Sequence, residues 1–347
     1  MILRRIEAIF RSKHAKPDLM LRDCFDFFAG SSTGAIIATT LALGWSVEEV
    51  LDLYQNRGAE MFIRSAWIDR KDNTYDAGPL EAIFREHVGD ESLGTAALWR
   101  TDDTLQQKVL LVIMRNASTG SAWPVCNHPA AKYNAPDHPD CNLRVPLWQL
   151  LRGSTAAPTF FRPQEIRFGA RAELFVDGGM TPYNNPAFIA ALMATLPAYR
   201  INWPVGPQQL QVVSIGTGMQ RTTLHRRRYI PMINVGFLDS VEFAAKALLD
   251  AAAMEQDLFC RLLGECRFGR TMDRELADLS GGSLLLPTEK KFSYVRYDHR
   301  FQPAEITAIE QRTGKPFDMA NVGLIPELVA LGEAYAAEHV QAEHFFL

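Results

Sequence analysis

One serine in this 347-residue chain lies in a pattern that can build a nucleophile. Gly30, Ser32 and Gly34 form the pattern G-x-S-x-G between an apolar segment and a segment of small residues. Hydrolases use this arrangement because a sharp turn from a strand into a helix exposes the serine hydroxyl, and glycines permit close backbone approach. The backbone N–H of Thr33, at the start of the helix, would then help to stabilise an oxyanion. The pattern alone leaves open a structural turn that caps the helix.

An acidic residue further along the chain could serve as the base. The segment Glu173–Val176 predicts a short strand that ends at Asp177 and is followed by Gly178 and Gly179. In open α/β sheets, binding and catalytic groups collect at the carboxyl ends of strands. Asp177 could therefore orient and deprotonate Ser32. Taken alone, an Asp-Gly-Gly sequence is more typical of an ordinary turn.

Histidines offer a second catalytic arrangement. A Ser-His-Asp triad of the α/β-hydrolase type would place its histidine after Asp177 in the chain. The candidates outside the C-terminal helical patterns are His225 and His299. Neither lies in a distinctive turn, so the sequence favours solvated side chains at both positions.

Two further groups of residues suggest binding rather than catalysis. Cys126, His128, His138 and Cys141 are zinc-type ligands within one loop, but their spacing fits no standard finger. We therefore predict no zinc site in this loop. Residues 225–228, His-Arg-Arg-Arg, precede apolar residues and could touch an anionic lipid surface, although a solvated loop is the more ordinary interpretation.

Composition limits the class of protein. The chain has 36 basic and 40 acidic residues, a net charge of −4, so its overall field gives no reason to expect nucleic acid as a partner. No stretch approaches the roughly 20 consecutive apolar residues of a membrane-spanning helix. The first ten residues predict an amphipathic helix rather than a signal peptide. Five widely spread cysteines fit a reducing compartment. These features predict a cytoplasmic protein, with peripheral contact to a membrane as a further expectation.

Strand and helix patterns alternate along the chain. Short apolar runs predict buried strands at 24–29, 109–114, 173–176 and 210–215. Apolar residues at helical spacing predict helices at 35–43, 47–58, 78–87, 186–196 and 241–263. This alternation predicts an α/β fold with a largely parallel central sheet flanked by helices. The proline-rich residues 123–146 predict a long loop, and residues 303–347 predict a C-terminal helical flank of the same domain.

Four segments, taken in chain order, resemble the patatin-like phospholipase family. They are 29–34 with the serine pattern, 147–161 with Gly-Ser-Thr-Ala-Ala-Pro-Thr-Phe-Phe, 175–186 with Asp-Gly-Gly and Asn-Asn-Pro, and 213–218 with Val-Ser-Ile-Gly-Thr-Gly. The resemblance covers most of the chain and implies a three-layer patatin-like fold. It implies a Ser-Asp dyad without histidine, with Ser32 as the nucleophile and Asp177 as the base. The implied activity is hydrolysis of acyl esters in phospholipids or other lipids, without metal or organic cofactor.

The chain departs from the family pattern at one place. Members of the family open with a strand and a loop of Gly-Gly-Gly, a basic residue and Gly, whose N–H groups form the oxyanion hole; these 347 residues contain no such segment. Met1 falls where the helix after that loop should begin, so we expect residues 1–302 to form the domain without its first strand and loop. Losing one oxyanion donor typically costs about 10²–10³ in rate. The expected function is therefore a serine lipid acyl hydrolase, or alternatively an N-terminally truncated, catalytically impaired lipid-binding or regulatory protein.

Overall fold

A mixed sheet forms one half of the molecule. The structure is a computed structural model that describes residues 1–61, 63, 75–95, 108–220, 237–280, 285–317 and 321–346. Four strands of its five-stranded sheet follow the order β1-β2-β5-β4, and the fifth strand, β3, pairs with β2. The strands are β1 (Phe27–Ser31), β2 (Val109–Asn116), β3 (Ser121–Cys126), β4 (Gln164–Phe168) and β5 (Arg171–Asp177). Strand β2 is its centre because Val109 to Met114 are all buried, as a run of apolar residues in a fully covered strand requires.

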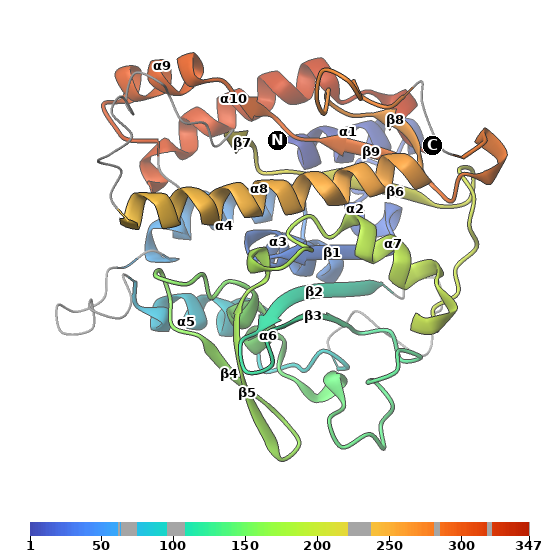
Figure 1. The fold of residues 1–347 in the computed structure, drawn as a ribbon, viewed down its shortest axis with the longest axis vertical. Helices are drawn as coiled ribbons and strands as arrows, with labels where there is room; N and C mark the ends of the chain where they lie inside the picture. The colour runs from blue at the N-terminus through green and yellow to red at the C-terminus, as the bar shows by residue number, and fades with distance from the viewer. Residues whose placement is uncertain are drawn as a thin grey trace.

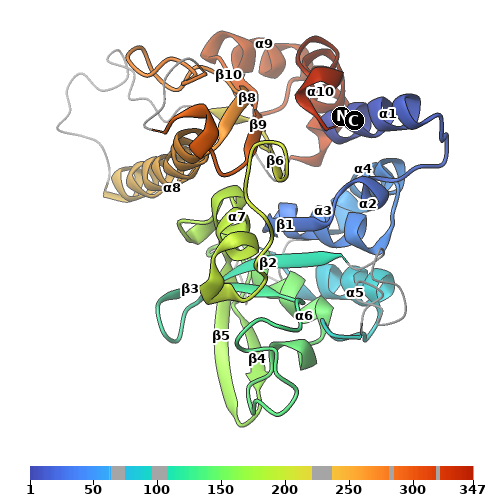
Figure 2. The ribbon, with the colours of Figure 1, turned by 90° about the vertical axis from the view of Figure 1, so that its right-hand side faces the viewer.

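A second sheet lies beside the first. Strands β6 (Gln211–Ile215), β9 (Ser293–Tyr297) and β8 (Glu265–Phe268) are parallel and follow the order β6-β9-β8. A short parallel pair, β7 (Met219–Gln220) with β10 (Arg300–Phe301), adjoins it. Figure 2 shows the two groups of strands one above the other, with β6 and β1 at the facing edges. Within the described ranges, β1 pairs with β2 alone and β6 with β9 alone.

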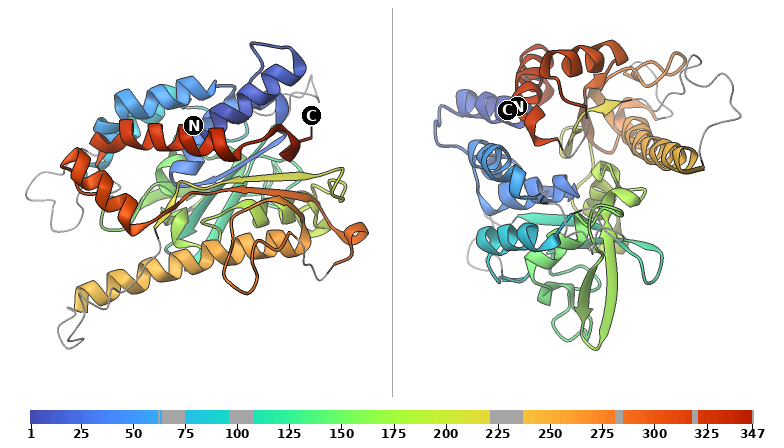
Figure 3. Two further views of the ribbon diagram at one scale, coloured as in Figure 1. Left: turned by 90° about the horizontal axis from the view of Figure 1, so that it is seen from above. Right: turned by 90° about the vertical axis from the view of Figure 1, so that its left-hand side faces the viewer.

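Helices cover both faces of the sheets. Figures 1 and 2 show α7 and α8 on one face and α1, α3, α4 and α5 on the other, and Figure 3 shows the same layers from above. The helices are α1 (Ile2–His14), α2 (Leu21–Cys24), α3 (Thr33–Leu43), α4 (Val47–Met61), α5 (Ala77–Val88), α6 (Leu147–Ser154), α7 (Ala187–Thr195), α8 (Phe237–Leu263), α9 (Pro303–Thr313) and α10 (Ile325–His339). None of them, in the described part of the chain, combines the length and apolar character that crossing a bilayer requires.

Helix packing joins the two sheets on each face. On one face α1 packs against α10, and the rings of Phe10 and Phe345 lie 5.7 Å apart. On the other face α7 packs against α8, where the rings of Phe188 and Phe259 lie 5.2 Å apart. The C-terminal segment is thus part of the same core as α1 rather than an appendage.

The architecture confirms the predicted α/β class. The pairs β1–β2, β6–β9 and β8–β9 are parallel, as expected for the centre of the fold, while β3, β4 and β5 add antiparallel pairs. Two boundaries were wrong. Residues 24–26 are not in a strand, because Cys24 ends helix α2. The predicted loop at 123–146 begins inside β3, where Pro124 pairs with Ile113. Among the described strands β3 pairs with β2 alone, and proline is tolerated in such an edge strand.

Candidate active site

The nucleophile candidate lies at a strained turn between β1 and α3. Ser32 has φ 52° and ψ −127°, a conformation that costs a non-glycine residue on the order of 1–3 kcal/mol. Two bonds hold it there: its carbonyl accepts the Ala35 N–H at 2.8 Å, and its own N–H donates to Ser154 Oγ at 2.9 Å. Ser32 is half-buried, so its side chain is within reach of solvent.

Close backbone contact explains one glycine of the serine pattern. A Cβ at Gly30 would lie 2.0 Å from the carbonyl oxygen of Gly34 and 2.4 Å from the Ala35 nitrogen. Strand β1 and helix α3 therefore meet more closely than any side chain permits. A Cβ at Gly34 would meet no atom within 4 Å, so open space lies above the first turn of α3. The two glycines thus have different roles: Gly30 permits packing, and Gly34 faces an empty region beside Ser32.

The base candidate contacts the nucleophile candidate directly. Ser32 Oγ donates to Asp177 Oδ2 at 2.6 Å. Asp177 Oδ1 accepts the Gly179 N–H at 2.7 Å, and the Asp177 N–H donates to the carbonyl of Ala156 at 3.0 Å. The carboxylate is therefore fixed on both oxygens, and its backbone is fixed as well.

Sheet register explains why the two residues meet. On β2, Ile113 is opposite Ser31 of β1, and the next residue, Met114, is opposite Asp177 of β5. The other edge of β2 is occupied by β3, in which Trp123 is opposite Met114. Strands β1 and β5 therefore approach each other along the same edge of β2, and their carboxyl ends meet.

The glycines after Asp177 let β5 end close to β2. A Cβ at Gly178 would lie 2.1 Å from the carbonyl oxygen of Ile113. A Cβ at Gly179 would lie 3.0 Å from Asp177 Oδ1 and 3.3 Å from Asn184 Oδ1. Gly178 thus permits the contact between strands, and Gly179 permits its own N–H to reach the carboxylate.

Burial sets the protonation of the base candidate. Asp177 is 6% exposed. Desolvation raises the pKa of its carboxyl from 3.8 to about 6, and the hydrogen bonds from Ser32 and Gly179 act in the opposite direction. A carboxylate that binds a proton near neutral pH can take one from a hydroxyl and return it later in a reaction.

An additional polar link ties the turn to the second sheet. Ser31 Oγ donates to the carbonyl of Asn184 at 2.9 Å. The next residue, Asn185, accepts from Ser214 Oγ of β6 at 2.9 Å, and Arg296 of β9 donates to the same hydroxyl at 2.7 Å. This link was not expected from the sequence, because its residues are up to 265 positions apart. The available signal is that Ser31, the Asn-Asn pair and Ser214 all belong to segments that carry the family resemblance.

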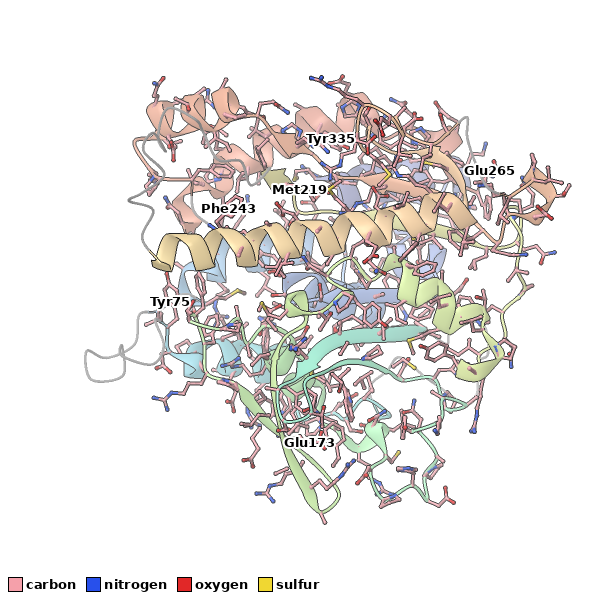
Figure 4. The ribbon with its side chains drawn as sticks, viewed as in Figure 1. Tyr75, Glu173, Met219, Phe243, Glu265 and Tyr335 are labelled. Carbon is pink, nitrogen blue, oxygen red and sulfur yellow. The ribbon has the colours of Figure 1, made fainter. Side chains whose placement is uncertain are left out.

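The alternative residues lie elsewhere or outside the described part. His299 Nε2 lies 3.0 Å from Glu305, and its ring packs against Tyr335, which Figure 4 labels. The ring of His344 bonds to the Tyr297 hydroxyl and packs against Phe268. His225 and the basic segment 225–228 lie outside the described residues.

The cysteine and histidine group forms turns. His128 Nδ1 accepts from the Ala130 N–H, and His138 Nδ1 accepts from the Asp140 N–H. Over the ranges that the structure describes, no group of three or more His, Cys, Asp or Glu side chains is placed to hold a metal ion.

Comparison with known proteins finds a matching family model and several similar proteins. The family model for patatin-like phospholipase matches residues 14–191, just over half of the chain, and this range includes both Ser32 and Asp177. The chain is 31% identical over 213 residues to an intracellular phospholipase A2 of Caenorhabditis elegans, a match that covers 58% of this chain and 17% of that protein. It is 27% identical over 223 residues to a cGAMP-activated phospholipase of Escherichia coli, with 62% and 57% covered.

The fold was also compared with solved structures. The crystal structure of VipD from Legionella pneumophila aligns with 96% of this chain and 65% of that chain, at 11% identity and a TM-score of 0.37. The matched regions of the two phospholipases are less than two thirds of their own lengths. The extent of the family-model match, which includes the serine turn and the Asp-Gly-Gly segment, shows that this chain belongs to the patatin-like phospholipase family.

Proposed function

We propose that this chain is a serine lipid acyl hydrolase that cleaves the carboxylic ester of a phospholipid or a related lipid. The observation that carries the proposal is the 2.6 Å hydrogen bond from Ser32 Oγ to Asp177 Oδ2, at a strained turn that ends β1 and begins α3. A buried carboxylate beside a half-exposed hydroxyl is the arrangement of a nucleophile with its base.

The reaction proceeds in two steps. Ser32 Oγ attacks the ester carbonyl while Asp177 accepts the hydroxyl proton, and the bond to the leaving alcohol breaks as Asp177 returns the proton to it. Asp177 then takes a proton from water, the hydroxide attacks the acyl-serine, and the fatty acid leaves as Ser32 regains its proton. The chain's own groups perform each proton transfer.

Two features beside Ser32 support this chemistry. The first N–H groups of a helix lack acceptors within that helix, so the N–H of Thr33 can donate to an oxyanion that forms on the substrate. A Cβ at Gly34 would meet no atom within 4 Å, so the chain leaves the first turn of α3 uncrowded at that position. The relatives named phospholipases support a lipid substrate. A cytoplasmic location with peripheral contact to a membrane completes the proposal, and the free thiols of all five cysteines are consistent with it.

The test is release of fatty acid from mixed phospholipid vesicles by the chain and by its Ser32→Ala variant. We expect release by the parent chain, and its reduction to background in the variant, because the acyl acceptor is gone. A neutral fluorophosphonate should label the parent chain at Ser32. Equal release by both proteins would contradict the proposed role of Ser32.

The alternative is a lipid-binding or regulatory member of the family. The observation that favours it is the pairing of β1 along one edge only in the described part. Vesicle co-sedimentation separates the two functions. Binding without fatty acid release, and without labelling of Ser32, would favour the regulatory protein.

A further inference from the structure

Ser154, the last residue of α6, makes two buried hydrogen bonds next to the dyad. Its Oγ accepts the backbone N–H of Ser32 at 2.9 Å and donates to the carbonyl of Ile113 at 2.7 Å. Its side chain is 0% exposed, so water cannot replace it in either bond. The hydroxyl therefore ties the strained turn that carries Ser32 to the central strand β2.

The point of attachment on β2 is where the two halves of the dyad meet. Ile113 is opposite Ser31 in the register, and Asp177 is opposite the following residue, Met114. Gly178 also lies against the Ile113 carbonyl, since a Cβ there would be 2.1 Å from its oxygen. Ser154 thus fixes the Ser32 backbone to the same short part of β2 that aligns the end of β5.

The segment that follows Ser154 holds the base from the other side. The carbonyl of Ala156 accepts the Asp177 N–H at 3.0 Å. Gly153 lets the helix end approach the sheet, because a Cβ there would lie 2.8 Å from Met114 Sδ and 3.3 Å from Phe175 Cβ. Ser154 and Ala156 therefore bond to the backbones of Ser32 and Asp177, respectively.

We propose that Ser154 is a positioning residue, which acts through the backbone of Ser32 and aims its hydroxyl at Asp177. The proposal rests on the proposed dyad function. Without the Ser154 hydroxyl, the Ser32 N–H has no acceptor, and the strained turn loses one of the bonds that oppose its relaxation. A shift of about 1 Å in a reacting group can cost on the order of 10² in rate.

The experiment compares Ser154→Ala with Thr155→Val. Thr155 is the neighbouring buried residue; its hydroxyl bonds only locally, to the carbonyls of Leu151 and Arg152. We expect Ser154→Ala to lower kcat for a soluble ester, and the rate at which a fluorophosphonate labels Ser32, by about 10- to 100-fold, with KM changed less than threefold. For Thr155→Val, kcat, KM and the labelling rate should each stay within about threefold of the parent chain. Ser154→Cys, whose thiol is a weaker donor and acceptor, should fall between alanine and serine.

A pH profile separates positioning from general destabilisation. The hydrogen bond from Ser32 Oγ lowers the pKa of Asp177. If Ser154→Ala turns Ser32 away and weakens this bond, the acid limb of kcat/KM should move to higher pH in that variant. The acid limb should stay in place in Thr155→Val. Thermal unfolding of each variant shows whether it is folded at the assay temperature. Labelling of Ser154→Ala at the parent rate, with an unmoved acid limb, overturns the positioning role alone. A parent chain that is not labelled at Ser32 overturns the dyad function and this inference with it.

Discussion

Replacing the buried carboxylate at position 177 should abolish activity and stabilise the fold. In Asp177→Asn the shape of the side chain is nearly unchanged, and its carbonyl oxygen can still accept the Gly179 N–H that now bonds to Oδ1 at 2.7 Å. The amide cannot accept the proton of Ser32 as a base does, so ester hydrolysis should fall to background. The amide also carries no charge in a site that is only 6% exposed.

The size of the gain follows from the pKa of Asp177. Burial raises it from 3.8 to about 6, a shift of about two units, which corresponds to about 3 kcal/mol. Between about pH 4 and pH 6 the folded chain retains a proton that the unfolded chain has released, so stability falls as the pH rises through this window. At pH 8 the carboxyl of Asp177 is charged in the folded and in the unfolded chain, so the full cost of burying this charge lowers the stability. We expect Asp177→Asn to be more stable than the parent chain by about 1–3 kcal/mol at pH 8, and by much less at pH 4.

Urea unfolding of both proteins at pH 4 and pH 8 measures this difference. Ser32→Ala is the matched control, because it keeps the buried carboxylate and removes a bond that lowers its pKa. From pH 4 to pH 8 that variant should lose at least as much unfolding free energy as the parent chain, because the carboxylate remains buried and one bond that stabilises its charge is gone. If Asp177→Asn and the parent chain have equal stability at pH 8 and the same pH dependence, the burial argument is wrong.

Three further outcomes follow from the structure. Gly30→Ala should abolish hydrolysis and lower stability by several kcal/mol, since its Cβ would lie 2.0 Å from the Gly34 carbonyl oxygen; activity and urea unfolding check this. Arg261→Met should cost about 3–5 kcal/mol in urea unfolding, because it leaves the buried Asp257, which Arg261 contacts at 2.9 Å, without its cation. The plot of kcat/KM against pH should fall on the acid side with an apparent pKa near 6, since protonated Asp177 cannot act as a base; a flat profile down to pH 5 would contradict this.

Matched controls exist for the two substitutions in that group. Gly78→Ala adds a Cβ in the first turn of α5 at an ordinary 3.4 Å from Asp76 Oδ1, so stability and activity should change little. Arg4→Met removes an exposed ion pair with Glu48 and Glu333, which should cost less than about 1 kcal/mol. If these control variants lost as much stability or activity as Gly30→Ala and Arg261→Met, the losses would come from the type of substitution and not from the two sites.

The local parts of the site could be predicted because the residues of each part are contiguous in the sequence. An apolar strand, a glycine-flanked serine and a helix of small residues follow one another at 27–43, and a strand followed by Asp-Gly-Gly does so at 171–179. The position of Asp177 at a strand end made a contact with Ser32 possible, and the family resemblance implied it. What brings them together is the register on β2, which depends on pairing between segments more than 50 residues apart.

Other elements were hidden by polar residues inside buried strands. Strand β9 is buried throughout but contains Arg296, which interrupts its apolar pattern. That guanidinium is tolerated because Asp298 lies 2.9 Å away and Ser214 accepts from it. Asn116 similarly ends β2 in a buried position beside Glu173 of β5, which Figure 4 labels. Such pairs become visible only when both partners are placed in space.

Because β1 and β5 both pair along one edge of β2, the register on that strand sets the distance between Ser32 and Asp177. Consecutive residues in a strand are about 3.3 Å apart, so a slip of one residue by either neighbour would separate Ser32 Oγ from its acceptor by more than a hydrogen bond can span. The distance between Ser32 and Asp177 is thus maintained by the same backbone amides that hold the sheet. Amide hydrogen exchange in β2 and loss of ester hydrolysis should therefore follow the same denaturation curve, since a chain in which β5 has left β2 has also lost the proposed catalytic pair.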